Sequence, residues 1–148
     1  MTLFVKQDVS AYTVRAASWH EDIQALRKIR EAVFIREQGV PTELEWDEFD
    51  VNCIHVLASD STANPVGTAR LLRDGSIGRV AVLREYRGKG VGIALMHFLL
   101  REAGSRQVQQ VTLNAQAHAI EFYKKFGFQV TGETFLDAGI PHVRMVLR

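Results

Sequence analysis

The sequence predicts an α/β fold with helices packed on a mixed sheet. The expected elements follow the order β-α-β-β-β-α-β-α-β-β. Three apolar segments between residues 53 and 83 are separated by turn residues, which is typical of an antiparallel meander. A glycine-rich turn then leads from the last of these strands into an apolar helix. The chain has 148 residues, and we expect one domain that spans residues 1–148.

The first third of the chain is expected to contain a strand, a long helix and an acidic loop. Residues 11–16 fit a strand and residues 18–39 a helix, with Ser18 as a candidate N-cap. The helix carries apolar residues at helical spacing on one face: Ile23, Leu26, Ile29, Val33 and Phe34. Gly39 and the following proline form a stop signal. Residues 42–52, TELEWDEFDVN, hold five carboxylates and are expected to form a loop.

The remaining elements are delimited by turn residues and by apolar periodicity. The meander consists of expected strands at 53–60, 66–75 and 76–83, with a turn at 61–65 and an Asp-Gly turn at the end of the second strand. The later segments are expected to be a helix at 90–103, a strand at 108–115, a helix at 116–127, and strands at 128–135 and 141–148.

Composition limits the classes of function. Apolar residues make up 47% of the chain, charged residues 24%, and the net charge is +1. This balance argues against nucleic acid or a membrane as a partner, and no segment has the length of a membrane span or the pattern of a signal peptide. Cys53 is the only cysteine, which excludes an intrachain disulfide. We therefore expect a cytoplasmic protein.

The turn RGKGVG, residues 87–92, has the chemistry of an anion site. It precedes a helix, whose first backbone N–H groups lack intrahelical acceptors and favour negative charge. Glycines allow a close backbone approach, and Arg87 and Lys89 add positive charge. A phosphate or pyrophosphate is one interpretation, and a solvated turn with incidental basic residues is the other. The spacing fits neither a Walker A loop nor a dinucleotide fingerprint.

Two motifs resemble those of the GNAT superfamily of acyl-CoA-dependent N-acyltransferases. The family pattern Arg/Gln-x-x-Gly-x-Gly/Ala is matched by RGKGVG, and Ala-x-x-Phe-Tyr-x-x-x-Gly-Phe is matched by AIEFYKKFGF, residues 119–128. The order of the elements also fits, so the resemblance covers nearly the whole chain. FIREQGVPTELEWDEFD and AGIPHVRM further resemble the ElaA/YjcF-like branch of bacterial GNAT proteins. The resemblance implies a central, mostly antiparallel sheet flanked by helices.

The resemblance also implies a site for acetyl-CoA. Its diphosphate would lie on the backbone of the turn, and its pantetheine arm would run along the preceding strand as an added strand does. That strand would have to part from the VTLNA strand. A backbone N–H near Val82 would polarise the thioester carbonyl. The implied cofactor-binding residues are Val80, Ala81, Val82, Arg87, Gly88, Lys89, Gly90, Val91, Gly92 and Gln116.

Tyr123 is the catalytic residue that the resemblance implies. The tyrosine of the second motif lies near the thioester sulfur in this family, where it can protonate the departing thiolate. The alternative is that Tyr123 only packs in the core beside Phe122 and Phe126. The family often has asparagine seven residues before this tyrosine. Gln116 occupies that position here, so its amide would lie one methylene further out.

The acceptor amine must lose a proton before or during attack, and several residues could accept it. Candidates on the acceptor side are Glu37, the carboxylates of TELEWDEFD with Glu48 among them, and His55, His118 and His142. The acidic segment interleaves with Trp46 and Phe49 and would suit a cationic amine; the alternative is a solvated surface. Spacing indicates no metal site, and Cys53 is expected to be a small buried apolar residue in its strand.

Two functions therefore remain as hypotheses. The first is an enzyme that moves acetyl from acetyl-CoA to a small amine or peptide by direct transfer, without a metal. The second is a non-catalytic acyl-CoA-binding module. Nucleic-acid binding is disfavoured because no basic helix face is present. The protein is expected to be a monomer or homodimer.

Overall fold

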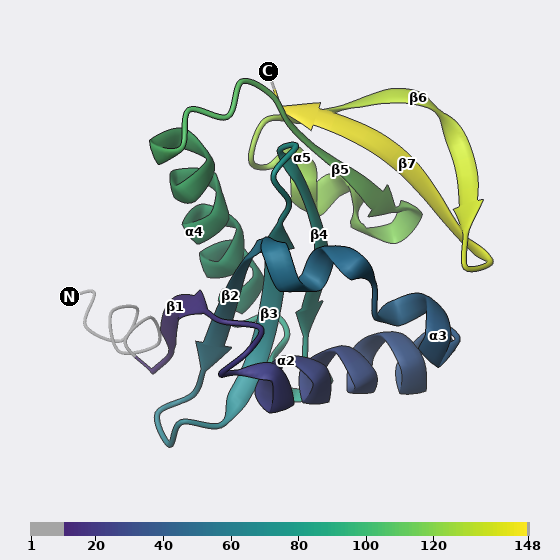
Figure 1. The fold of residues 1–148 in the computed structure, drawn as a ribbon. Coiled ribbons are helices and arrows are strands. Elements are labelled where there is room, and N and C mark those ends of the chain that lie inside the picture. The colour runs from purple at the N-terminus through teal and green to yellow at the C-terminus, as the bar shows by residue number, and fades with distance from the viewer. Residues whose placement is uncertain (1–10, 148) are drawn as a thin grey trace.

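The computed structural model describes residues 11–147, and its seven strands form one mixed sheet in the order β1-β2-β3-β4-β5-β7-β6 (Figure 1). The strands are β1 (Thr13–Ala17), β2 (Ile54–Ser59), β3 (Pro65–Leu71), β4 (Ser76–Val82), β5 (Val111–Gln116), β6 (Phe128–Asp137) and β7 (Ile140–Leu147). Neighbouring strands are antiparallel except for the parallel pair β4 and β5. The expected mixed α/β architecture is confirmed.

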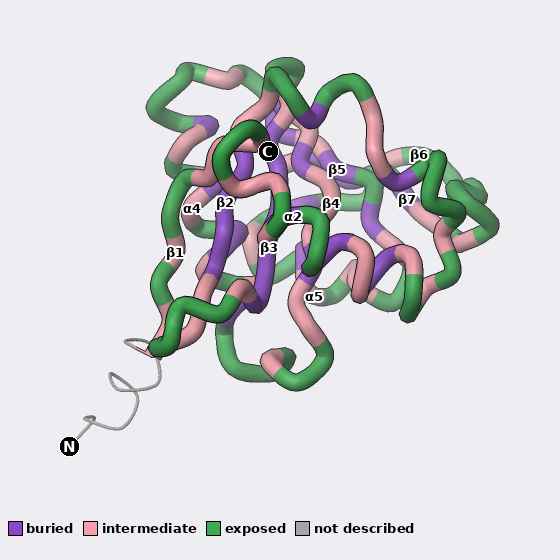
Figure 2. Tube along the Cα trace, turned by 60° about the horizontal axis from the view of Figure 1, so that its bottom comes forward, coloured by how far each residue is buried: buried purple, intermediate pink, exposed green. Residues whose placement is uncertain are grey.

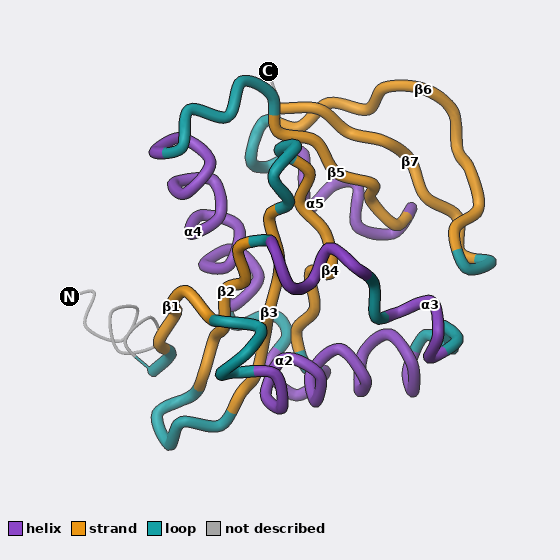
Figure 3. Tube along the Cα trace, in the orientation of Figure 1, coloured by secondary structure: helices purple, strands orange, loops and turns teal. Residues whose placement is uncertain are grey.

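Helices cover both faces of the sheet (Figure 3). They are α2 (Ile23–Arg30), the π-helix η1 (Glu31–Glu37), α3 (Thr42–Glu45), α4 (Val91–Ser105), α5 (Ile120–Lys124) and the 3-10 helices η2 (Glu48–Asn52), η3 (Arg84–Tyr86) and η4 (Ala117–Ala119). Side chains of a strand alternate between faces. In β2, Val56 and Ala58 pack with α4, whereas Leu57 packs with α2.

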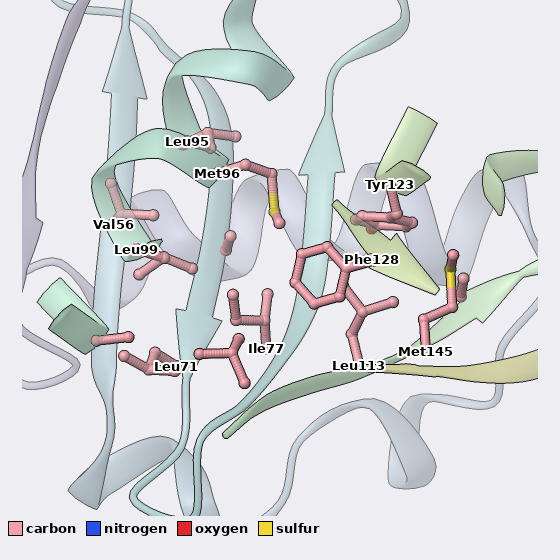
Figure 4. Packing of buried hydrophobic residues seen from close by; sticks show 14 of the residues in the cluster. Val56, Leu71, Ile77, Leu95, Met96, Leu99, Leu113, Tyr123, Phe128 and Met145 are labelled. Atoms are coloured by element: carbon pink, nitrogen blue, oxygen red, sulfur yellow. The ribbon is translucent and has the colours of Figure 1, made fainter. Parts of the chain in front are cut away.

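Burial is concentrated in the central strands and in α4 (Figure 2). On the α4 face, Ile77 of β4 and Leu113 of β5 lie in one apolar cluster with Met96 of α4 (Figure 4). Tyr123 and Phe128 belong to the same cluster. Because the side chains of Ile77 and Leu113 point to this face, their neighbours along the two strands point to the opposite face. The candidate site lies where β4 and β5 separate, and residues from both faces of the sheet line it.

The expected helix at 18–39 is wrong at its start and in its geometry. The helix begins at Ile23, because Ser18 Oγ accepts hydrogen bonds from the N–H groups of His20 and Glu21 in a preceding turn. From Glu31 onward it continues as a π-helix to Glu37. π-helical turns are rare and are frequently found at functional sites. This turn places Glu37 and Gln38 beside the candidate site.

The expected loop at 42–52 is also wrong, since it forms α3 and η2. Asp47 caps η2: its carboxylate accepts from the Phe49 N–H, and the Asp50 carboxylate accepts from the Asp47 N–H. This reciprocal cap satisfies donors that a helix start leaves free.

The other boundaries differ from the sequence predictions by a few residues. The expected strand at 108–115 is β5, which begins at Val111, and the expected helix at 116–127 is split between η4 and α5. Gly127, with φ +99°, follows α5 before β6 begins. Among residues 11–147, no helix combines the length and the apolar composition that crossing a bilayer requires.

Candidate active site

The site is built around a separation of β4 from β5. The two strands pair only through Ser76 with Thr112 and Ile77 with Leu113, and the rest of β4 has no partner on that side. In Figure 1, the strands diverge from this short paired region. β5 instead pairs along its whole length with β7. The expectation that β4 parts from the VTLNA strand is confirmed.

A β-bulge in β4 causes the strand to bend near this point. On β3, Thr68 pairs with Ala81 and Arg70 pairs with Gly78, so β4 has one extra residue between these pairs. Arg79 lies in the extra segment with φ +52°, a conformation uncommon for a residue with a side chain. Bulges of this kind increase the local twist and redirect the strand.

Val82 directs its backbone groups to the separated side of β4. The Leu83 N–H donates to Val66 O on β3, at 2.9 Å. Since successive residues of a strand direct their polar groups to opposite sides, the N–H and C=O of Val82 point toward the space that β5 has left. The Val82 carbonyl accepts a hydrogen bond from Arg87 Nε, at 2.9 Å. The Val82 N–H remains available to a ligand.

A cavity of about 1320 Å³ follows this separation. It runs from the turn before α4, along β4, to the hairpin of β6 and β7. Most of the predicted site residues line it: Glu37, Val80, Ala81, Val82, Arg87, Gly88, Gly90, Val91, Gly92, Gln116, Tyr123 and His142. Lys89 and Glu48 do not line it, and Glu48 is exposed on η2.

The turn at residues 87–92 has the backbone of an anion site. Gly90 caps α4 with φ +85°, and Gly88 has φ +75°. No heavy atom lies within 4 Å of a Cβ built at either glycine, so the space next to the backbone is open. The first helical bond joins the Ala94 N–H to Gly90 O. The N–H groups of residues 91–93 therefore precede the helical ladder and are free for a ligand.

Glu37 and Arg87 connect the π-helix to this turn. Arg87 Nη1 and Nη2 donate to the two oxygens of Glu37, at 2.8 and 2.7 Å. Arg84 Nη2 lies 3.4 Å from Glu37 Oε2. The hydrogen bonds from Arg87 hold the pKa of Glu37 below its usual range, assisted by the charges of both arginines. A carboxylate stabilised in this way is a poor proton acceptor for an amine.

Tyr123 is buried, and its hydroxyl has no protein partner among the described residues. The side chain is 9% exposed and makes edge-to-face contacts with Phe122 and Phe128. Within residues 11–147, the hydroxyl oxygen is without a hydrogen-bond partner but is not fully buried, and the residue lines the cavity. Burial raises the pKa of the Tyr123 phenol. The hydroxyl is therefore protonated at neutral pH and can donate to a group in the cavity.

Gln116 lies at the end of β5 and is held by two neighbours. Its Nε2 donates to Gln38 Oε1 at 2.7 Å, and its Oε1 lies 2.7 Å from His118 Nε2. A carbonyl oxygen can only accept, so His118 Nε2 is the donor. Gln38 was not predicted from the sequence; only its position at the end of a helix that carries Glu37 could have indicated it.

His142 is opposite Gln116 across the pair of β5 and β7. Its Nδ1 lies 2.7 Å from the Ile140 carbonyl, and its ring stacks on Phe135. Since the carbonyl can only accept, Nδ1 carries the hydrogen and Nε2 of the neutral ring has a free lone pair. His118 also lines the cavity and keeps a free Nδ1, but it is exposed, whereas His142 is half-buried.

The acidic segment does not form the expected acidic wall. Arg30, 1% exposed, donates to Glu45 at 2.8 Å and to Asp50 at 2.7 Å. Arg70 donates to Asp50 and Asp47, at 2.7 Å in both cases. Burial alone would raise the pKa of Asp50, but the hydrogen bonds and charges of the two arginines hold it below its usual range. Three arginines, with Arg79 as the third, thus neutralise these carboxylates.

Cys53 differs from the prediction, whereas His55, a predicted proton acceptor, is buried in β2 with Nε2 2.8 Å from the Asp50 carbonyl. Cys53 is half-buried, precedes β2 and lies with Sγ 3.3 Å from His55 Nε2. Burial raises the pKa of the Cys53 thiol to about 11, so the nucleophilic thiolate is rare at neutral pH. Cys53, His55 and Asp50 could approach one metal ion. The Asp50 oxygens already accept from Arg30 and Arg70, whose charges disfavour a cation there.

Comparison with known proteins gives a family match over nearly the whole chain. A family model described as Acetyltransferase (GNAT) domain matches residues 14–148. The protein named Uncharacterized N-acetyltransferase YjcF, from Bacillus subtilis, is 42% identical over 122 residues, which cover 80% of this chain and 86% of the relative.

Solved structures agree with this match. The crystal structure of Escherichia coli ElaA has a TM-score of 0.81 at 32% identity, over 92% of this chain and 99% of that one. An acyl-CoA N-acyltransferase from Pseudomonas aeruginosa has a TM-score of 0.81 at 29% identity, over 93% and 99% of the two chains.

Proposed function

The chain belongs to the GNAT acetyltransferase family and is an acyltransferase enzyme, and we propose that it moves acetyl from acetyl-CoA to a primary amine by direct transfer. One observation carries the proposal. β4 loses its β5 partner after Ile77, and this separation opens the unpaired edge of Val82 into a cavity that also reaches the turn before α4 and Tyr123.

The residues of the turn and of β4 would bind the CoA part of the substrate. The free N–H groups of residues 91–93 and the open space at Gly88 and Gly90 suit a diphosphate. Arg87 adds a guanidinium at the same place. The unpaired backbone of β4 would bind the amides of the pantetheine arm, as a sheet edge binds a strand.

Val82 and Tyr123 would act on the thioester. The Val82 N–H would donate to the carbonyl oxygen as negative charge develops on it during attack. The amine nitrogen forms a bond to the carbonyl carbon, and the bond from carbon to sulfur breaks. The Tyr123 hydroxyl would give its proton to the departing sulfur. Its raised pKa keeps that proton available at neutral and moderately alkaline pH.

His142 would accept the proton of the attacking amine. The hydrogen bond from Nδ1 to Ile140 O leaves Nε2 as the only free acceptor of the neutral ring. Glu37 is less suited, because its ion pair with Arg87 lowers its pKa. We propose His142 as general base and Glu37 as a positioning residue for Arg87.

The reaction is proposed to take place in the cytoplasm, because the single cysteine fits a reducing compartment.

The acceptor is proposed to be a small amine or a peptide amine. Ile140 and His142 line the cavity at the hairpin of β6 and β7, and we expect the acceptor to enter from this side, opposite the turn.

A thiol-release assay tests the function. Purified protein is mixed with acetyl-CoA and each member of a panel of primary amines, and the acetylated product is identified by mass spectrometry. The proposal predicts one thiol released for each amide formed. CoA binding without thiol release for any amine would contradict the proposal and favour the non-catalytic binding module.

A further inference from the structure

Four residues from four strands lie in register on the sheet face opposite α4. Arg70 of β3 pairs with Gly78 of β4, and Asn114 of β5 pairs with Arg144 of β7. Gly78 and Asn114 immediately follow the last pair of β4 and β5, Ile77 with Leu113. We call Arg70, Gly78, Asn114 and Arg144 the cross-sheet row; all four line the cavity.

The middle of the cross-sheet row is hollow. A Cβ built at Gly78 would meet no heavy atom within 4 Å. The strands also begin to separate here, so Gly78 and Asn114 are not held together by ladder bonds. The Asn114 side chain is exposed, and its amide is a free donor and acceptor within the described chain. The open space at Gly78 and the amide of Asn114 therefore lie between Arg70 and Arg144.

The two arginines at the ends of the cross-sheet row differ, since Arg70 already pairs with Asp47 and Asp50. Arg70 is 5% exposed, and its Nε is the one fully buried side-chain nitrogen or oxygen of residues 11–147 without a hydrogen-bond partner. Arg144 has no carboxylate oxygen within 4 Å in the same part of the chain. Of the carboxylates that line the cavity, Glu45 is paired with Arg30 and Arg79, and Glu37 is paired with Arg87.

Two other carboxylates line the cavity without pairing with Arg144. Asp74 accepts hydrogen bonds from the N–H and the hydroxyl of Ser76, which hold it in the turn before β4. Asp137 is exposed at the end of β6. The guanidinium of Arg144 can therefore bind an anionic group from solution in a bidentate manner.

The spacing between Arg144 and His142, the proposed base, indicates how far the amine of the acceptor lies from the group that Arg144 binds. His142 precedes Arg144 by two residues on β7 and points to the same face. Two residues of a strand span roughly 7 Å. If the amine of the acceptor lies at His142, a second group of the acceptor about 7 Å from that amine would lie beside Arg144.

We propose that the acceptor amine carries a carboxylate and that Arg144, with Asn114 beside it, binds this group. The inference rests on the proposed function, because it assigns the chemistry of the acceptor. An ω-amino acid or a lysine side chain with a free carboxylate has this chemistry. Arg144 is then a specificity-determining residue that acts on binding and orientation.

The test compares acceptors that differ only in charge. Thiol release is measured with β-alanine, γ-aminobutyrate and ε-aminohexanoate, and with the primary amide of each. A charge-assisted bidentate contact predicts that kcat/KM is about 10- to 100-fold higher for the best carboxylate than for its amide. In R144Q this ratio should fall to near one, mainly through KM, and R144K should retain part of it.

R101Q is the matched control, since Arg101 is exposed on α4, outside the cavity lining. It should keep the wild-type ratio. CoA-dependent stabilisation of R144Q shows that the variant is folded. If amides and carboxylates are acetylated equally, or R144Q keeps the preference, this inference fails while the proposed function stands. If no amine releases thiol, the proposed function fails and the inference with it.

Discussion

Tyr123 and His142 lie in environments that match opposite halves of an acid–base reaction. The phenol is 9% exposed, and burial raises its pKa, so it keeps its proton. The imidazole donates through Nδ1 to a carbonyl and keeps a lone pair on Nε2. One group can donate a proton while the other accepts one. This complementarity underlies the roles proposed for them.

Substitution of Tyr123 by phenylalanine separates chemistry from packing. The ring and its contacts with Phe122 and Phe128 survive, and only the hydroxyl is lost. We expect Y123F to lower kcat by about 10²- to 10⁴-fold, the usual cost of losing a general acid, with nearly unchanged CoA affinity. Steady-state kinetics measures kcat, and a thermal-shift titration with CoA measures the affinity for CoA. Y12F is the control, and wild-type turnover in Y123F would leave the tyrosine with a packing role only.

At the scale of elements, periodicity predicted where most helices and strands lie, but not their irregular parts. The apolar spacing of Leu26, Ile29 and Val33 indicates a helix, and these residues are buried on its inner face. The same spacing carries no sign that the backbone widens into a π-helix at Glu31. The π-helical segment ends at Glu37, whose partner Arg87 lies 50 positions later in the chain, and local apolar spacing cannot indicate such a contact.

The bulge in β4 shows a second limit. Glycine or asparagine would have indicated a positive φ, but the residue is Arg79. Its guanidinium donates to the Glu45 carbonyl and lies 3.1 Å from the Glu45 carboxylate, so long-range contacts hold the strained backbone. The separation of β4 from β5 was expected from the family resemblance. Its physical cause became visible only with the register of the strands.

The α4 turn offers a matched pair of substitutions. Gly90 has φ +85°, which asparagine and aspartate tolerate better than most residues, and the two side chains have nearly the same shape. We expect G90D to abolish CoA stabilisation, because its charge repels the diphosphate at the helix start. G90N should retain more of it. Thermal-shift titration with CoA measures this difference, and equal affinities for G90D, G90N and the wild type would remove the turn from the binding site.

Across the whole molecule, a buried ionic network connects α2, α3 and η2 to the sheet. Arg30 of α2, Glu45 of α3, Asp50 of η2 and Arg70 of β3 are each at most 5% exposed. The acidic composition of residues 42–52 predicted either a solvated surface or an acidic wall; Glu43 and Glu48 are exposed, but Glu45, Asp47 and Asp50 pair with arginines. Composition could not reveal this arrangement, because the three arginine partners lie on distant segments. The network holds α3 against the cavity.

Removal of one charge from this network should destabilise the fold. D50N leaves Arg30 and Arg70 with incomplete partners in a buried place. Loss of one member of a buried pair typically costs about 3–5 kcal/mol. Chemical denaturation measures the free energy of unfolding. The control E121Q removes an exposed pair with Lys124 and should cost less than about 0.5 kcal/mol. A similar small cost for D50N would show that the network contributes little to stability.

The central claim is that acetyl-CoA binds along the edge of β4 that β5 leaves unpaired. Amide hydrogen exchange, followed by NMR with and without CoA, tests this residue by residue. The Val82 N–H points into the separation, whereas the neighbouring Ala81 pairs with Thr68 of β3. CoA is expected to slow exchange at Val82 by about tenfold or more, with a smaller change at Ala81. Unchanged exchange at Val82 with CoA bound would contradict the claim.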